Sequence, residues 1–169
     1  LLMLGGRLGD RYGHRLMFMM GVAGFMLASV MAALSPGITI LLIARALQGI
    51  SAALLAPAAL ALLMRLFPVG DGRAQAISVW GAVAGIGGVT GAMLGGFLTT
   101  TFGWAAIFYI NVPICLAVIA AVPLLIERDA DLHTAPLDVP GAMTITIGMS
   151  LLVAALSFMY LVRNMHLAW

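Results

Sequence analysis

The chain has 169 residues, of which 63% are hydrophobic and only 8% are charged, whereas a soluble domain carries roughly 25% charged residues. This composition excludes a soluble fold. The net charge of +2 comes from arginines, because the chain contains no lysine. Such a small excess indicates membrane topology and argues against nucleic-acid binding.

Apolar runs follow one another along the chain, and a run of about 20 residues crosses a hydrocarbon core of ~30 Å as a helix. None shows the period-two alternation of a membrane strand, so we expect an all-α, polytopic transmembrane helical bundle. Residues 1–4 should end one helix and lead into a polar turn. Complete spans are then predicted at residues 16–34, 41–67, 74–101, 107–126 and 139–161.

The placement of arginine predicts the orientation of these spans. The turns after residues 34 and 102 contain no arginine, and arginines are found in the alternate connections instead. Because positively charged loops stay in the cytoplasm, we expect the arginine-rich connections on that side. They carry Arg7, Arg11, Arg15, Arg65, Arg73 and Arg128.

Arg45 is a charged residue in the interior of a predicted span, whereas Arg65 lies near the end of the same span. A guanidinium keeps its proton, and a charge at the bilayer centre costs at least ~2.5 kcal/mol. Arg45 should therefore be buried and face a water-filled cavity, a ligand or a partner on another helix. Steps of three and four along the helix give a polar and small-residue stripe, made of Gln48, Gly49, Ala52, Ala53 and Ala56.

A structural arginine is the alternative interpretation. If the helix begins near residue 38, Arg45 lies about 10 Å along its axis. A long side chain at that depth can extend to the interface and leave its charge in water.

The first polar connection, GRLGDRYGHR at residues 6–15, combines glycines, one acid and several bases. It resembles the G-x-L-x-D-R-x-G-R-R pattern between helices two and three of the major facilitator superfamily, with His14 at the position of a commoner base. In that family the acid and the arginines form a cytoplasmic latch that breaks during alternating access. The resemblance implies that Asp10, Arg11 and Arg15 are the latch, and that Gly6 and Gly13 permit close helix approach.

The helix that contains Arg45 is similar to helix four of the same family, which carries an arginine, a glutamine and a glycine at the corresponding spacing. The resemblance implies that Arg45 takes part in proton coupling, and that Gln48 and Gly49 line the substrate cavity. A guanidinium stabilises an ionised carboxyl group and so lowers the pKa of a proton carrier.

The third complete span is rich in glycine. Positions 87, 91 and 95 form small-xxx-small repeats, which allow two helix backbones to approach closely. The segment GGVTGAMLGG at residues 87–96 resembles the antiporter motif G-x-x-x-G-P-x-x-G-G, with Ala92 in place of proline. The resemblance implies that this face packs between the two halves of a transporter; its glycines are Gly81, Gly85, Gly87, Gly88, Gly91, Gly95 and Gly96.

Two further segments indicate a branch of the family. WAAIFYINVP at residues 104–113 and LDVPG at residues 137–141 resemble the starts of helices six and seven in the fourteen-helix drug:proton antiporters. On this basis residues 1–138 are part of an N-terminal six-helix bundle, from the end of helix two to the loop after helix six. Residues 139–169 are helix seven and its outer end, so helix one and the second half are missing.

The resemblance implies a secondary transporter that exports lipophilic or cationic compounds in exchange for protons. Its expected partners are the bilayer, protons, the substrate and the missing helices, with no cofactor or metal. An uptake symporter or another facilitator of the family is the alternative, favoured by Ala92. A membrane-embedded enzyme is more remote, because no predicted span contains His, Asp or Glu. A purely structural membrane protein would have no use for Arg45.

Overall fold

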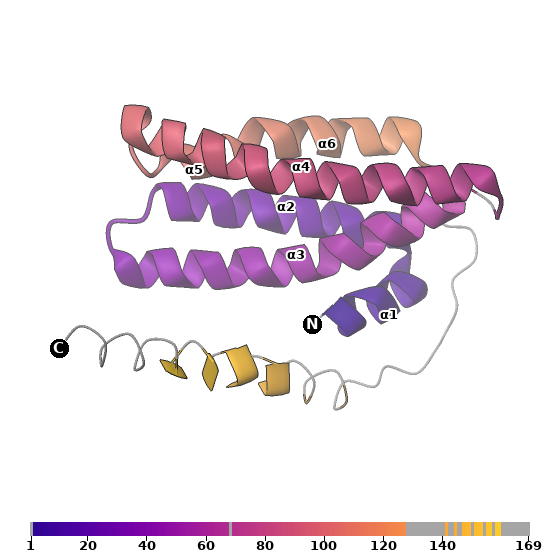
Figure 1. Cartoon of the computed structure of the whole chain (residues 1–169), viewed down its shortest axis with the longest axis horizontal. Coiled ribbons are helices and arrows are strands. Elements are labelled where there is room, and N and C mark those ends of the chain that lie inside the picture. The colour runs from indigo at the N-terminus through magenta and orange to yellow at the C-terminus, as the bar shows by residue number, and fades with distance from the viewer. Residues whose placement is uncertain are drawn as a thin grey trace.

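The structure, a computed structural model, describes residues 2–67, 69–127, 141, 144, 147–149, 151–153, 155, 156, 158 and 159. Its helices are α1 (Leu2–Tyr12), α2 (His14–Ala33), α3 (Ile38–Leu66), α4 (Asp71–Phe102), α5 (Ala106–Tyr109) and α6 (Asn111–Leu125) (Figure 1). The described residues contain no strand, and the predicted all-α class is confirmed. Most of the predicted span at 139–161, and the predicted domain boundary at residue 138, lie outside the described residues.

Four helical segments are long and apolar enough to cross a membrane in the described part of the chain. They are His14–Ala33, Ile38–Leu66, Asp71–Phe102 and Ala106–Leu125. The last segment combines α5 and α6. These segments correspond to the first four complete spans predicted from the sequence, so the chain is part of a multi-pass membrane protein.

The predicted polar turn after residue 4 is wrong. Residues 5–12 continue α1, and the chain changes direction at Gly13 alone, with φ 97° and ψ 132°. Gly13 N–H closes the last turn of α1 on the Gly9 carbonyl, while the Gly13 carbonyl accepts from Met17 N–H in α2. A residue without a Cβ adopts this φ at little cost, so the polar residues on both sides keep helical hydrogen bonds.

The fourth predicted span is also divided, because α5 ends at Tyr109 and α6 begins at Asn111. Pro113 has no N–H, so the helical hydrogen bond that would end on the Tyr109 carbonyl cannot form. Ile110 between the two helices keeps nearly helical angles, φ −61° and ψ −26°. The segment therefore continues in one general direction with a local interruption.

α2 is the central helix and contacts α1, α3, α5 and α6. It forms an antiparallel pair with α3, joined by a short turn (Figure 1). The small residues Gly21 and Gly24 face Leu55 and Ser51 of α3, which lets the two backbones approach closely. Near the α2–α3 turn, a compact apolar cluster joins α2, α3 and α5. It is formed by Ala32, Ala33, Ala44 and Phe108.

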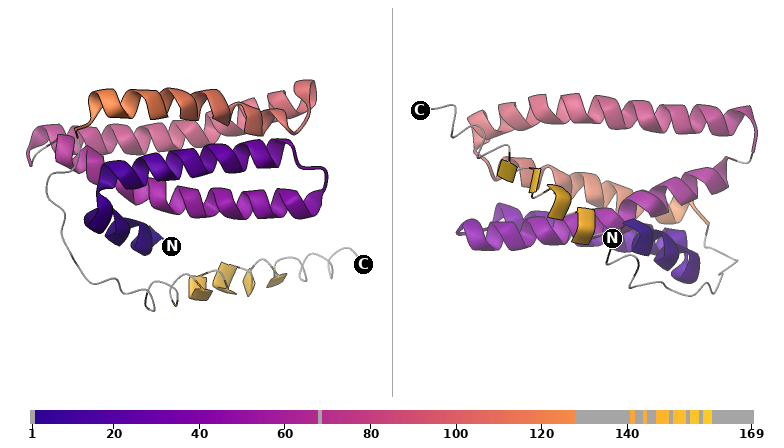
Figure 2. Two further views of the ribbon diagram at one scale, coloured as in Figure 1. Left: turned by 180° about the vertical axis from the view of Figure 1, so that it is seen from behind. Right: turned by 60° about the horizontal axis from the view of Figure 1, so that its bottom comes forward.

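α4 lies apart from the remaining helices (Figure 2). It contacts only α5 and α3 among the described helices, and none of its residues is buried. α4 is a 32-residue apolar helix without a buried face, so the surface with which it would pack against other helices is exposed.

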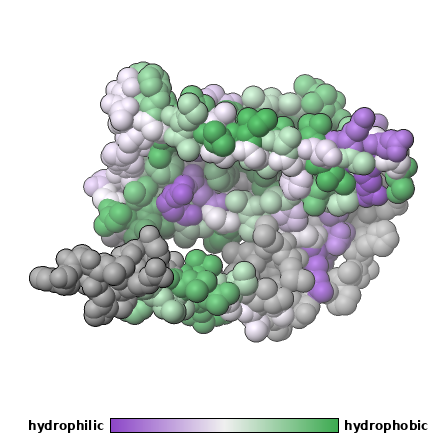
Figure 3. All heavy atoms as spheres, viewed as in Figure 1, coloured by the Kyte–Doolittle hydropathy of each residue, from purple (hydrophilic) through white to green (hydrophobic). Residues whose placement is uncertain are grey.

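The connections that carry arginine lie at one end of the bundle. The α1–α2 and α3–α4 junctions are at the right of Figure 1, and the α2–α3 and α4–α5 turns are at the left. Hydrophilic residues are more widespread at the right end in the space-filling view, and a smaller hydrophilic patch lies left of centre (Figure 3). This asymmetry is what the positive-inside rule requires of a cytoplasmic face.

A polar junction at Arg45

Arg45 is exposed on the described chain, so the expectation that it is buried is wrong here. Its neighbours Ala44 and Gln48 are buried at 0% and 3% exposure. Successive residues are rotated by about 100° around a helix. When Ala44 and Gln48 face α2, the Arg45 side chain therefore extends from the edge of the α2–α3 contact. Arg45 therefore lies at the margin of the α2–α3 interface.

Two contacts orient the Arg45 guanidinium. Its Nη1 donates to Gln48 Oε1 at 3.2 Å, and its Cζ lies 5.8 Å from the centroid of the Phe108 ring. Phe108 belongs to α5, is 6% exposed and makes an edge-to-face contact with Trp104. Among the described residues Arg45 has no acidic partner, so an amide oxygen and an aromatic face offset its charge.

Gln48 continues the contact into the interior. Its Nε2 donates to Ser29 Oγ at 2.7 Å, and the Ser29 hydroxyl donates to the Phe25 carbonyl at 2.7 Å. Ser29 is fully buried. Because buried polar groups are costly without partners, these bonds are what makes a glutamine tolerable between α2 and α3.

Asn111 of α6 reaches the same serine. Its Nδ2 lies 3.5 Å from Ser29 Oγ and 3.4 Å from the Ile107 carbonyl, both at the long limit of hydrogen bonding. A continuous series of polar side chains thus links α3, α2 and α6. We call it the polar junction; its members are Arg45, Gln48, Ser29 and Asn111.

The sequence interpretation did not identify Ser29, Phe108 or Asn111 as members of the site. Phe108 and Asn111 both lie in the WAAIFYINVP segment, so that motif was the signal that could have identified them. A serine inside an apolar span carries no comparable signal, because most such hydroxyls bond only to their own helix.

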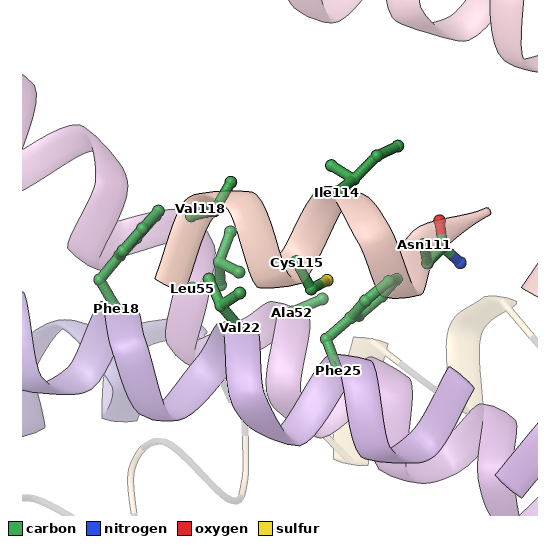
Figure 4. A pocket seen from close by; sticks show the side chains of 9 residues that line it. All are labelled: Phe18, Val22, Phe25, Ala52, Leu55, Asn111, Ile114, Cys115 and Val118. Atoms are coloured by element: carbon green, nitrogen blue, oxygen red, sulfur yellow. The ribbon is translucent and has the colours of Figure 1, made fainter. Parts of the chain in front are cut away.

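An apolar pocket of about 280 Å³ lies between α2, α3 and α6. Figure 4 shows Asn111 at one end of it beside Phe25, and Phe18 at the other end. The remaining wall is aliphatic apart from the thiol of Cys115. Its lining residues are Phe18, Val22, Phe25, Ala52, Leu55, Asn111, Ile114, Cys115 and Val118.

Gln48 and Gly49, expected to line a substrate cavity, do not line this pocket. Gln48 is part of the polar junction, and Gly49 is exposed with open space around the position of a Cβ. Gly49 lies four residues from Arg45 and so shares its face of α3. The two predicted cavity residues therefore lie on different sides of the helix.

The expected latch residues surround the α1–α2 junction. Asp10 is exposed, and its Oδ1 lies 3.2 Å from Nε2 of His14, the first residue of α2. The Arg11 guanidinium lies over the adjacent Tyr12 ring at 5.6 Å, and Arg15 is half-buried. Asp10 thus has a partner within the chain, at the position where the family pattern has a commoner base.

The close approach expected at Gly6 occurs one residue earlier. A Cβ on Gly5 would collide with the Ala53 carbonyl oxygen and lie 3.1 Å from Pro57 Cγ, whereas a Cβ on Gly6 would meet only Pro57 Cβ at 3.9 Å. Adjacent residues point about 100° apart around a helix, so Gly5 faces α3 directly whereas Gly6 lies at the side of the contact. Gly13 acts through its backbone angle, as described above.

The glycines of α4 have open space where a side chain would begin, among the described residues. A Cβ at any of them would meet nothing within 4 Å, as found at Gly81, Gly85, Gly87, Gly88, Gly91, Gly95 and Gly96. The structure brings none of them close to the polar junction. Their small-residue face is open.

Comparisons with known proteins cover nearly the whole chain. The family model described as Major Facilitator Superfamily matches residues 1–169. The tetracenomycin C resistance and export protein of Streptomyces glaucescens is 42% identical over 154 residues, which is 90% of this chain and 28% of that protein. A puromycin resistance protein of Streptomyces alboniger is 42% identical over 143 residues, which is 85% of this chain and 28% of the relative.

A third relative is a multidrug efflux pump of Mycolicibacterium smegmatis, 37% identical over 138 residues. The match covers 82% of this chain and 27% of the pump. The chain thus spans between a quarter and a third of the length of these relatives.

Proposed function

This chain belongs to the major facilitator superfamily and is a multi-pass protein of the cell membrane, and we propose that its full-length gene product exports drugs or other lipophilic compounds in exchange for protons. The observation that carries the proposal is the similarity to resistance and export proteins along 82–90% of the chain. Because the chain spans only part of those proteins, transport is a property of the full-length product and not of this segment alone.

We place Arg45 at the centre of proton coupling. It occupies an apolar span, and within the described residues its guanidinium contacts an amide oxygen and the face of an aromatic ring. An opposite charge lowers the pKa of a carboxyl group brought close to it, and protonation of that carboxyl group weakens the attraction. A carboxylate from another part of the protein would therefore approach Arg45 in its ionised form and leave it when protonated, which ties proton binding to helix movement.

On α3, Gly49 lies on the proposed cavity side, and Gln48 supports that side from the interface with α2. Gly49 leaves open space on the same face as Arg45, and Gln48 holds the guanidinium from the next turn. A lipophilic and often cationic substrate would enter from the cytoplasm or the inner leaflet. The open space at Gly49 leaves room for it beside the charge.

The α1–α2 junction and α4 supply the proposed contacts with the rest of the protein. Asp10, Arg11 and Arg15, with the bend at Gly13, form a cytoplasmic latch that would also contact helices outside this chain, in addition to the pairing of Asp10 with His14. The open glycine face of α4 packs against those helices when the two halves meet, because glycine repeats let helix backbones approach closely. Gly6, at the same end, leaves room beside Pro57 for a close approach of α1.

We further propose that the protein has no catalytic activity, as is general for this family of transporters. Ala92, which replaces the proline of the antiporter motif, favours a second candidate, uptake of a substrate together with protons. A helix without that proline lacks its usual kink, and direction of transport is therefore the property to measure first.

The test is efflux of a fluorescent cationic dye by the full-length gene product in a sensitive bacterial host. Wild type should expel the dye, and a protonophore should stop it. Arg45→Ala should lower the rate by about 10-fold or more, the effect of ~1.4 kcal/mol on a barrier. Arg65→Ala, which removes the same charge near the end of α3, is the matched control and should retain efflux.

Each alternative result has a definite meaning. Accumulation of dye in energised cells would replace export by uptake. Efflux that is indifferent to the protonophore would remove proton coupling. Equal rates for Arg45→Ala and Arg65→Ala, at matched expression, would remove Arg45 from the mechanism.

A further inference from the structure

We infer that Ser29 and Asn111 are positioning residues for Arg45, acting on it through Gln48. The importance of this positioning for transport rests on the proposed function of Arg45. The positioning itself follows from the geometry of the polar junction. Ser29 and Asn111 belong to α2 and α6. The orientation of a charge on α3 is thereby decided by two other helices.

The direction of each hydrogen bond follows from Arg45. A guanidinium can only donate, so the amide oxygen of Gln48 must face it. The amide nitrogen of Gln48 must then face Ser29 and donate to its Oγ. Because Ser29 Oγ accepts this bond, its own hydrogen must go elsewhere, and it goes to the Phe25 carbonyl.

Asn111 occupies the second acceptor site of the same hydroxyl oxygen. A hydroxyl offers one donor and two acceptor positions, and the bonds to Phe25, Gln48 and Asn111 use all of them. Ser29 is fully buried, so water does not compete for these sites. Bonds in such an environment constrain geometry more strongly than bonds at a surface.

The consequence for Arg45 is a restricted set of orientations. Gln48 is held by Ser29 at 2.7 Å, while its other end accepts from Arg45 at 3.2 Å. Without the serine oxygen, the Gln48 amide loses its buried partner and is free to rotate, and the guanidinium loses a fixed acceptor. Asn111 also lines the apolar pocket, so a change at the pocket wall that moves Asn111 reaches Arg45 through the same bonds.

Ser51 supplies a matched control. Like Ser29 it is a buried serine, 8% exposed, whose Oγ donates to the carbonyl four residues earlier, that of Leu47. In the described chain it makes no hydrogen bond to another helix. Ser29→Ala and Ser51→Ala therefore remove the same group at similar burial, and only the first opens the polar junction.

The test measures how readily the Arg45 guanidinium reacts with phenylglyoxal, an arginine-selective dicarbonyl, in membranes that contain the full-length gene product. Mass spectrometry of the peptide that contains Arg45 gives its modification rate, with Arg11 as the internal reference. Ser29→Ala and Asn111→Leu should raise the Arg45 rate by about 5-fold, the factor that matches loss of ~1 kcal/mol of hydrogen bonding. Ser51→Ala should leave it unchanged.

Equal Arg45 rates in Ser29→Ala, Asn111→Leu and Ser51→Ala would overturn the inference, and a rise in Ser29→Ala alone would overturn it for Asn111. The labelling requires no transport, so a wild type that moves no dye would defeat the proposed function and leave this result intact. In the efflux assay, the two junction variants should lose activity and Ser51→Ala should keep it.

Discussion

Two adjacent glycines in α1 should respond in opposite ways to the same substitution. Gly5→Ala places a methyl group against the Ala53 carbonyl oxygen and 3.1 Å from Pro57, whereas Gly6→Ala places it at an ordinary distance of 3.9 Å. Overpacking of this kind costs ~1–3 kcal/mol. Both variants gain up to ~1 kcal/mol from the better helix propensity of alanine.

The helix propensity gain is common to both variants, so their difference isolates the contact with α3. Gly5→Ala should be less stable than Gly6→Ala by ~1–3 kcal/mol, which is about 5- to 150-fold in the folding equilibrium. The carbonyl belongs to the backbone of α3 and cannot rotate away, so the helices themselves must separate. Gly6→Ala should equal wild type or exceed it slightly.

The assay is unfolding of the purified full-length gene product in mixed micelles with increasing SDS, followed by tryptophan fluorescence and circular dichroism. The transition midpoint of Gly5→Ala should fall well below those of wild type and Gly6→Ala. If both variants unfold together, α1 does not approach α3 as the structure describes. If Gly6→Ala is the less stable of the two, the rotation assigned to α1 is wrong.

Three further substitutions, with Gly49→Ala as a control, test the bend, the central helix pair and the aromatic contact. Gly13→Ala forces a side chain into a backbone conformation with positive φ and should cost ~1–3 kcal/mol in the same unfolding assay; an unchanged midpoint would contradict the single-residue bend. Gly21→Ala brings a methyl group to 3.0 Å from the Leu55 side chain and should destabilise the folded protein by ~1–3 kcal/mol. Gly49→Ala, which has open space around the added methyl group, should not destabilise it. Equal effects of the two substitutions would refute the packing of α2 on α3. Phe108→Leu removes the aromatic face under Arg45 and should raise phenylglyoxal modification of Arg45 by about 2- to 5-fold, as expected for a cation–π contact of ~0.5–1 kcal/mol; no change would exclude that contact.

The polar junction gives the aromatic and amide residues of one motif a common physical role. Phe108 contacts the Arg45 guanidinium directly, and Asn111 bonds to the serine that holds Gln48. Both lie close to the break between α5 and α6 that Pro113 explains. The break thus occurs where α5 and α6 both contribute side chains to the surroundings of Arg45.

Composition and hydropathy determined the all-α membrane class and the four complete spans that the structure describes, because a helix that crosses lipid must be apolar along about 20 residues whatever it packs against. The family resemblance followed from short motifs that stand in the sequence itself. The position of Arg45 as a charge inside an apolar span was likewise visible without a fold.

Only the tertiary structure decided which side chains meet. The family resemblance placed Gly6 rather than Gly5 against a neighbouring helix. The sequence pattern also predicted a polar turn where Gly13 alone bends the chain, and described Arg45 as buried although it lies at the margin of α3. Each error concerns rotation about a helix axis or the pairing of helices, and these depend on contacts between residues far apart in the chain. Ser29 and Asn111 are 82 positions apart, and no local pattern can place an asparagine beside a serine until the helices that carry them are packed together.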